Sequence, residues 1–191
     1  MQVYEPKEDS FLLRESIMKE NLVGKKCLDL GCGSGLQGIA MHKVGSKNIF
    51  CVDINYKALL STQKNMLDIK NFIKFIESDL FSSLKGEIFD FIAFNPPYVP
   101  SDEIKWKDLD GGKNGSEIID KFLSQFLGHL SSNGVCLLLI SSLNNKEKII
   151  SKLKKMGLFV EIVASKKLFF EELFVLRITR TESIGVDEIN F

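Results

Sequence analysis

The sequence predicts an α/β protein built on a mostly parallel, Rossmann-like sheet. Three observations predict this class: an apolar run at 26–30 that leads into the glycine-rich segment 31–35 and a helical pattern, a second apolar run at 49–52 that ends in Asp53, and further apolar runs that alternate with helical ones. A strand, a glycine-rich turn and a helix form the first unit of nucleotide-binding α/β folds. Strands that alternate with helices favour a parallel sheet.

Length and composition fit one domain, which we expect to span residues 1–180. Of 191 residues, 45% are hydrophobic and 26% charged, as in ordinary globular domains. Lys plus Arg equals Asp plus Glu at 25 each, which argues against affinity from a basic nucleic-acid footprint. The sequence shows no membrane-spanning run and no signal peptide. We therefore expect a cytoplasmic protein without membrane contact or strong nucleic-acid binding.

The cysteines and histidines show no metal-binding pattern. The four cysteines lack the paired spacing of metal ligands, and we interpret them as reduced, structural residues: Cys27, Cys32, Cys51 and Cys136. His42 and His129 are far apart in helical patterns, so structural roles are expected for both. No metal ion is expected in this chain.

The first twenty residues predict a flanking helix. Pro6 followed by Glu8 and Asp9 is typical of a helix start, because proline fits the first turn and acidic side chains interact favourably with the helix dipole. Four residues farther along can supply the buried face: Phe11, Leu12, Ile17 and Met18. The pattern alone indicates an amphipathic helix beside the sheet, which we expect within residues 1–20.

The segment after the first strand predicts a binding loop, and two interpretations fit its glycines. Gly33, Gly35 and Gly38 match the spacing of dinucleotide-binding folds. Residues 29–35, Asp-Leu-Gly-Cys-Gly-Ser-Gly, also fit the loop of methyltransferases that use S-adenosylmethionine. Gly38 is tolerated in the helix that follows because that helix must come close to its neighbour.

Three polar residues follow three successive predicted strands. Asp53 follows the strand at 49–52 and lies 22 residues after Gly31, where such folds place a carboxylate that binds ribose hydroxyls. Asp79 follows a strand at 72–76, and Asn95 ends an apolar run that starts at residue 88. Because parallel strands end at one edge of a sheet, we expect these side chains to share a ligand site. Each one alone is also explained as a turn former or a helix cap.

Residues 95–98, Asn-Pro-Pro-Tyr, end the last of these strands abruptly. Asn95 precedes a proline and favours extended backbone, while Pro96 and Pro97 have fixed φ angles and no amide hydrogens. The result is a rigid group of oxygen acceptors, the Asn95 side chain and nearby carbonyls, beside the flat ring of Tyr98. Such a group suits a planar NH2, which needs two acceptors in its plane and a surface to lie against. The alternative is an ordinary proline turn.

The second half of the chain is predicted to complete the sheet. Residues 99–115 form a long glycine-rich loop beside the expected site, either a substrate-covering flap or a packed surface loop. Strands at 158–163 and 173–179 lie too close together for a helical crossover and should pair antiparallel. Residues 181–191 are expected to form a flexible tail. The other expected elements are helices at 36–44, 55–68, 116–130 (N-cap Ser116) and 146–156, and a strand at 134–140.

Taken in order, the motifs resemble those of the HemK-type N5-glutamine methyltransferases, and in particular the short eukaryotic and archaeal branch that modifies class I peptide-chain release factors. Residues 4–13 (YEPKEDSFLL) are similar to the amino-terminal signature of that branch, with serine at Ser10 where many relatives have threonine. Three further motifs are similar to its cofactor loop, catalytic motif and downstream glycine loop: 28–35 (LDLGCGSG), 95–98 (NPPY) and 111–115 (GGKNG).

The resemblance implies a class I S-adenosylmethionine-dependent methyltransferase fold, with a seven-stranded sheet whose last strand is inserted antiparallel between its neighbours. The cofactor would be S-adenosylmethionine and the product S-adenosylhomocysteine. Ser10 and Gly31 would lie near the methionine end of the cofactor, Asp29 would face its amino group, Asp53 its ribose, and Asp79 with Leu80 its adenine. Gly33 and Asn95 complete the implied cofactor site. The implied catalytic residues are Asn95, Pro96, Pro97 and Tyr98, of which Asn95, Pro96 and Tyr98 would contact substrate.

The implied reaction is methylation of the side-chain amide nitrogen of the glutamine in the Gly-Gly-Gln motif of a release factor. The resemblance also implies a small zinc-binding activator subunit that pairs with the exposed sheet edge near Phe72 and Ile76 (residues 72–76). One alternative is methylation of the exocyclic amine of adenine in nucleic acid, or of another protein side chain; on a base, the same acceptor geometry would hold a flipped adenine. Two further alternatives are a nicotinamide-dependent oxidoreductase and a non-catalytic binding module.

Overall fold

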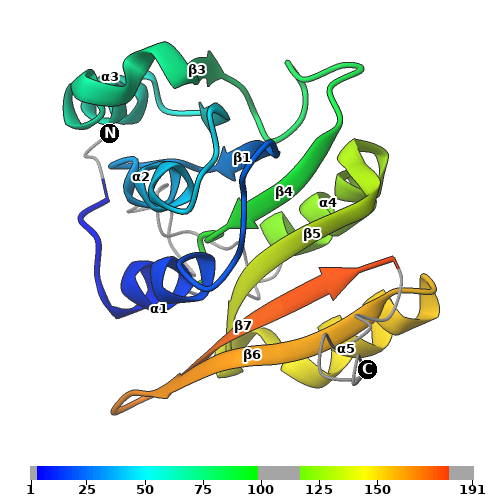
Figure 1. Ribbon diagram of the computed structural model, residues 1–191. Helices are drawn as coiled ribbons and strands as arrows, with labels where there is room; N and C mark the ends of the chain where they lie inside the picture. The colour runs from blue at the N-terminus through cyan, green and yellow to red at the C-terminus, as the bar shows by residue number, and fades with distance from the viewer. Residues whose placement is uncertain (1–3, 99–116, 181–191) are drawn as a thin grey trace, which may run out of the picture.

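The computed structural model describes residues 4–98 and 117–180, and these residues are built around a seven-stranded sheet (Figure 1). The strands lie side by side in the order β3-β2-β1-β4-β5-β7-β6. Their bounds are β1 (Lys26–Leu30), β2 (Asn48–Asp53), β3 (Ile73–Glu77), β4 (Phe89–Phe94), β5 (Leu130–Ser141), β6 (Phe159–Lys167) and β7 (Glu172–Thr179). The predicted α/β class and the seven-stranded sheet are confirmed.

The direction of the strands follows from the length of their connections. Strands β1 to β5 pair in parallel, whereas β7 pairs antiparallel with both β5 and β6. A parallel pair needs a crossover of about a dozen residues or more. Only residues 168–171 connect β6 and β7, and they close a hairpin in which Leu168 N donates to the Glu171 carbonyl at 2.8 Å. The predicted antiparallel insertion of the last strand is therefore confirmed.

Helices cover both faces of the sheet (Figure 1). Helices α1 (Glu8–Ile17), α2 (Leu36–Lys43) and α3 (Tyr56–Asn65) pack on one face, and α4 (Glu117–Gln125) and α5 (Lys146–Lys155) on the other. Successive strand residues point to opposite faces, so Leu28 and Leu30 join the core under α4 and α5 while Cys27 joins the core under α1 and α2. None of the helices within 4–98 and 117–180 has both the length and the apolar character needed to cross a membrane.

The first helix begins later than the proline pattern predicts. Lys7 is the N-cap of α1, so Pro6 precedes the helix and does not occupy its first turn. Glu8 and Asp9 do lie in the first turn, as predicted. Only Glu8 is exposed, however, whereas Asp9 is 4% exposed and takes part in a polar network described below.

The predicted boundary between the helix at 116–130 and the strand at 134–140 is wrong. Helix α4 ends at Gln125, the 3-10 helix η2 (Phe126–His129) follows, and Leu130 already begins β5. Leu130 pairs with Phe89, and the register shifts between Phe89 and Phe91, so the residues after Leu130 are accommodated in an irregular part of the ladder. The polar sequence of residues 131–134 hides this strand start, because Ser, Asn and Gly are the usual turn residues.

The edge strand β3 also starts at a different residue from the one predicted. Helix α3 ends at Asn65, and the 3-10 helix η1 (Leu67–Phe72) contains Phe72, so the strand begins at Ile73 and ends at Glu77. The predicted position of this strand at an edge of the sheet is confirmed by the strand order. Its neighbour on one side is β2, and no described residue pairs with its other side.

The cysteines and histidines make packing contacts. All four cysteines are buried and free of disulfides, and burial raises the pKa of the Cys27 thiol to about 11. The His42 ring stacks on Phe72 with 5.2 Å between centroids, and the His129 ring stacks on Phe81 at 4.5 Å. His129 Nδ1 also lies 2.8 Å from the carbonyl of Glu87. Structural roles for both histidines agree with the prediction.

Candidate active site

A cavity of about 510 Å³ opens at the carboxyl ends of β1, β2 and β4. Parallel α/β sheets bind their ligands at this edge. All the site residues expected from the sequence line the cavity: Ser10, Asp29, Gly31, Gly33, Asp53, Asp79, Leu80, Asn95, Pro96, Pro97 and Tyr98. Tyr4, Asp9 and Gln37 line it too, although their side chains were not predicted to take part.

The loop between β1 and α2 is held in a conformation that requires glycine. Gly31, Gly33 and Gly35 have φ angles of 66°, 53° and 84°, in the left-handed region that disfavours other residues. Thr62 Oγ1 donates to the Gly33 carbonyl at 2.9 Å, and Asn65 Nδ2 donates to the Ser34 carbonyl at 2.9 Å. Helix α3 therefore supports the loop from behind and fixes its backbone against the cavity.

Gly38 brings helix α2 close to the sheet. A Cβ atom at this position would lie 2.9 Å from Cys51 Sγ and 3.0 Å from Met66 Cε, closer than such atoms normally come. This close approach lets Gly38 N donate to Asp29 Oδ2 at 2.9 Å. The predicted packing role of Gly38 is therefore confirmed.

Asp29 lies at the end of β1 and is 1% exposed. Burial raises the pKa of its carboxyl to about 7, the Gly38 amide hydrogen bond opposes the shift, and the charge of Asp53 adds to it. Burying a carboxylate is costly without compensating partners. The negative charge of Asp29 therefore favours a cation in the adjoining cavity.

Asp53 is the last residue of β2 and its carboxylate is fixed by backbone amides. Gly33 N donates to Oδ2 at 3.0 Å, and Asn55 N donates to Oδ1 at 2.8 Å. These contacts orient Asp53, which lines the cavity. The contact with Gly33 also joins the acid to the glycine loop.

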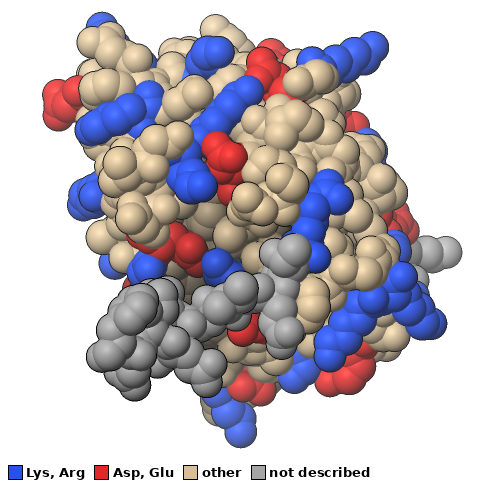
Figure 2. All heavy atoms as spheres, turned by 45° about the vertical axis from the view of Figure 1, so that its right-hand side comes forward, with Lys and Arg blue, Asp and Glu red and all other residues tan. Residues whose placement is uncertain are grey.

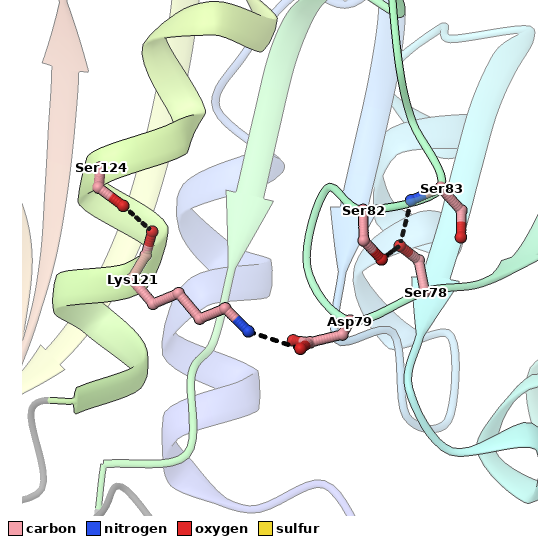
Figure 3. A network of polar contacts seen from close by, with 6 residues as sticks. All are labelled: Ser78, Asp79, Ser82, Ser83, Lys121 and Ser124. Atoms are coloured by element: carbon pink, nitrogen blue, oxygen red, sulfur yellow. Dashed lines mark hydrogen bonds and ion pairs between the residues drawn. The ribbon is translucent and has the colours of Figure 1, made fainter.

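Asp79 lines the cavity in the loop after β3 and pairs with a lysine of helix α4 (Figure 3). Lys121 Nζ reaches Asp79 Oδ2 at 2.5 Å, across from α4 to the loop after β3. Behind Asp79, Ser83 N donates to Ser78 Oγ at 2.9 Å, and the hydroxyls of Ser78 and Ser82 lie 3.1 Å apart. The next residue, Leu80, has a positive φ of 49° and packs into the core. The loop is thus held by contacts on both sides. Asp79 and Leu80, both predicted site residues, line the cavity.

The side chain of Asn95 is fixed in one orientation by helix α1. Its Nδ2 donates to Asp9 Oδ2 at 3.1 Å and to Ser10 Oγ at 3.4 Å. A carboxylate only accepts, so the NH2 of Asn95 must face Asp9 and its Oδ1 must face the other way. Oδ1 is buried and has no hydrogen-bond partner among the described residues. Such unsatisfied buried acceptors are rare in folded proteins and mark a place for a ligand donor.

Asp9 is the centre of the network that holds Asn95. Its carboxylate accepts from the Tyr4 hydroxyl at 2.9 and 3.0 Å and from Ser10 N at 2.6 Å. Burial and the nearby Asp9 carboxylate raise the pKa of Tyr4 and of Tyr98, so both phenols stay protonated. The sequence interpretation missed Asp9, because an acid in the first turn of a helix is already explained by the helix dipole. The sequence signal that could have indicated Asp9 was its position within the amino-terminal signature at residues 4–13.

The Asn-Pro-Pro-Tyr segment 95–98 is also held by a contact from another part of the chain. Asn144 Nδ2, in the 3-10 helix η3 (Ser142–Asn144), donates to the Tyr98 carbonyl at 2.9 Å. Tyr98 itself is 9% exposed and packs in the core under α1 and α2. The predicted flap at 99–115, the N-cap Ser116 and the tail at 181–191 lie outside the described residues.

Comparisons with known proteins identify the family of this chain. The family model of the methyltransferase small domain matches residues 8–170. A relative from Methanocaldococcus jannaschii, provisionally named a protein N5-glutamine methyltransferase, is 43% identical over 186 residues, which cover 94% of this chain and 92% of the relative. This chain belongs to the HemK-type N5-glutamine methyltransferase family. The human relative, named methyltransferase HEMK2, is 32% identical and covers 94% of this chain and 90% of its own.

A solved structure of a HemK-type relative has the same fold. The complex of Mtq2 and Trm112 from E. cuniculi, described as responsible for methylation of the translation termination factor eRF1, contains a chain that matches with a TM-score of 0.78 at 27% identity. The match covers 95% of this chain and all of that one (100%). The class I methyltransferase fold implied by the resemblance is therefore confirmed, and this HemK-type chain is a methyltransferase.

Proposed function

We propose that this methyltransferase transfers a methyl group from S-adenosylmethionine to the side-chain amide nitrogen of the glutamine in the Gly-Gly-Gln motif of a class I peptide-chain release factor. One observation carries the proposal: Asn95 lines the cavity and has a buried Oδ1 with no hydrogen-bond partner among the described residues, while its NH2 is committed to Asp9. An acceptor fixed in this way suits a primary amide, whose NH2 has two hydrogens to donate. The eRF1 described for the E. cuniculi relative supports the substrate class.

We infer that the cavity binds S-adenosylmethionine, because the residues that line it offer groups suited to each part of the cofactor. The glycine loop with Gly31 and Gly33 would take the methionine end together with Ser10, and the carboxylate of Asp29 would bind the cationic amino group. Asp53, held by backbone amides at 3.0 and 2.8 Å, would accept from the ribose hydroxyls. Asp79 and Leu80 would lie along the adenine. When bound, the cofactor supplies a methyl group on a positively charged sulfur.

The residues of the chain act mainly by positioning. An amide nitrogen is a weak nucleophile, because its lone pair is delocalised into the carbonyl. In our proposal, Asn95 Oδ1 and the Pro96 carbonyl accept the two amide hydrogens of the substrate, and the fixed φ of Pro96 and Pro97 keeps these acceptors in place. Tyr98 packs against the amide plane. Such alignment can lower a barrier by about 7–11 kcal/mol in well-oriented reactions.

The acceptors also stabilise the charge that develops on the substrate nitrogen. The methylated nitrogen is strongly acidic and releases its proton to water, so the proposal assigns no side chain as a strong base. No histidine or lysine lines the cavity among residues 4–98 and 117–180. In our proposal, the reaction therefore depends on oriented oxygen atoms.

We further propose that a small zinc-binding activator subunit pairs with strand β3. The E. cuniculi relative was solved in complex with Trm112, and β3 is the edge strand to which another strand can be added. Leu67 and Phe72, which directly precede β3 in η1, are 59% and 38% exposed and extend the apolar surface beside it. The cytoplasm, where translation ends, is the compartment we expect for the reaction.

Transfer of a labelled methyl group tests the proposed function directly. The protein, with and without the activator, is incubated with labelled S-adenosylmethionine and a release factor whose Gly-Gly-Gln glutamine is intact or changed to glutamate. We expect label only on the intact glutamine. Single-stranded DNA and RNA serve as competing acceptors, and label on adenine would support the alternative instead. On the part of the face in Figure 2 that is not grey, acidic and basic side chains are interspersed, which does not favour nucleic acid as the acceptor.

A further inference from the structure

Two aromatic side chains project from the hairpin that connects β6 and β7. Phe169 and Phe170 are 92% and 87% exposed, the highest values among the large hydrophobic residues that the structure describes. Their ring centroids lie 4.6 Å apart with the planes at 84°, which is a favourable edge-to-face arrangement. Large apolar side chains kept together in water commonly mark a site of protein interaction.

The hairpin tip lies on the same edge of the sheet as the active site. Leu173 pairs with Ser141 at the carboxyl end of β5, and Phe94 pairs with Leu138 of the same strand. Residues 168–171 therefore extend past the edge at which Asn95 lies, as the tip at the lower left of Figure 1 shows. From the strand spacing and the rise per residue, the tip is about 20 Å from Asn95. This distance places the aromatic pair beside the opening of the cavity and not inside the cavity.

The base of the hairpin is tied to the turn that holds the catalytic motif. Ser141 Oγ donates to the Glu171 carboxylate at 2.5 Å, and Glu172 N donates to Ser142 Oγ at 3.0 Å. The same turn contains Asn144, whose Nδ2 donates to the Tyr98 carbonyl. Phe169 and Phe170 are thus presented on a support that is connected to residues 95–98. Presentation on a rigid support lowers the entropy cost of binding.

We propose that Phe169 and Phe170 form a docking anchor for the protein substrate, inserted into an apolar pocket on the body of the release factor away from its glutamine loop. This inference rests on the proposed function, since a protein that places its glutamine at Asn95 must lie across this edge of the sheet. Lys166 and Lys167 are exposed at the end of β6 beside the tip, so we expect acidic groups at the rim of that pocket. The activator is assigned to β3, at the other end of the strand order.

The double variant Phe169→Ser/Phe170→Ser tests the anchor by steady-state kinetics with the intact release factor. We expect KM for the release factor to rise at least about tenfold, as for truncated aromatic hot spots, while kcat and the affinity for S-adenosylmethionine stay within about twofold. Phe169→Leu/Phe170→Leu keeps part of the apolar surface and should give an intermediate KM. Val23→Ser is the matched control: Val23 is 71% exposed but precedes β1, so it lies at the amino ends of the parallel strands, away from the cavity.

Three results would overturn the anchor. An unchanged KM would remove its role in substrate binding, and a fall in kcat at constant KM would assign the hairpin to support of Ser141. Loss of a dimer in sedimentation, without a change in KM, would assign the tip to contact between two copies of this chain. Failure of the unaltered enzyme to methylate the release factor would refute the proposed function itself, and that result is separate because it does not involve the variants.

Discussion

At the scale of single residues, Asp9 determines which way the Asn95 side chain faces. Without its carboxylate, the Asn95 amide can rotate and present Nδ2 where an acceptor is needed. We predict that Asp9→Ala lowers kcat about tenfold to a hundredfold, in line with the loss of one oriented polar group, with S-adenosylmethionine affinity changed only a few-fold. The control is Glu8→Ala, since Glu8 is exposed one position away. An unchanged kcat at full thermal stability would show that Asn95 is oriented without Asp9.

The raised pKa of Asp29 predicts how cofactor affinity depends on pH. Because the folded protein holds this proton up to about pH 7, whereas an unfolded chain releases it near pH 4, ionisation of Asp29 costs stability as pH rises through that interval. A cationic amino group binds the ionised form. Calorimetry from pH 5.5 to pH 8 should therefore show affinity that increases up to about pH 7 and then levels off. Asp29→Asn should bind weakly at every pH; a steep profile in that variant would contradict the assignment.

Sequence patterns predicted that Asn95, Asp53 and Asp29 belong to the candidate site, and all three line the cavity, because each has a signature that depends on spacing along the chain. The contact between Asp9 and Asn95 joins residues 86 positions apart, and no local pattern carries that information. The same holds for Lys121, whose ion pair with Asp79 fixes the cavity rim. Local chemistry therefore predicts the residues of the site, but their mutual orientation needs the fold.

At the scale of elements, the packing of α2 on the sheet depends on the missing side chain of Gly38. A methyl group there would meet Cys51 Sγ at 2.9 Å. Overpacking costs about 1–3 kcal/mol, and alanine recovers up to about 1 kcal/mol of helix propensity. We predict that Gly38→Ala lowers the free energy of unfolding by about 1–2 kcal/mol in urea titrations. Gly128→Ala, with nothing within 4 Å of the added Cβ, should have almost no effect; equal losses in both variants would refute the packing role.

The two edges of the sheet offer a matched pair of substitutions for the activator. Phe72 precedes β3 and is 38% exposed, while Phe159 begins β6 at the opposite edge and is 42% exposed. A charge beside an interface is costly when water is excluded. We predict that Phe72→Glu weakens activator binding at least about tenfold and Phe159→Glu leaves it unchanged, as measured by sedimentation with the purified subunit. Weaker activator binding by Phe159→Glu, with binding by Phe72→Glu unchanged, would instead place the activator at β6.

Elements with a uniform pattern were predicted at nearly the correct residues, and those with a mixed pattern were not. The first strand has the predicted bounds, and α2 and α5 each end one residue before the predicted end. The start of β5 was missed because Ser131 and Gly134 carry turn chemistry, although Leu130 before them and Val135 after them both pair with β4. Tertiary pairing overrides local preference in such cases.

At the scale of the whole molecule, the apolar cores and the polar residues of the candidate site occupy different parts of the fold. Two apolar cores on the opposite faces of the sheet hold the strands in register, and the polar residues of the site gather at the carboxyl edge. Three surfaces then serve three different contacts in our account: the cavity for cofactor and amide, the edge at β3 for the activator, and the β6–β7 tip for the substrate body. The order of the strands keeps these contacts apart.

The most direct measurement compares the unaltered enzyme with Asn95→Ala in single-turnover methyl transfer to a release factor, with S-adenosylmethionine affinity measured by calorimetry on both. Removal of the oriented acceptor should slow transfer at least about a hundredfold, while the cofactor dissociation constant changes only a few-fold. Transfer by Asn95→Ala at a rate near that of the unaltered enzyme would contradict the role assigned to Oδ1 of this residue.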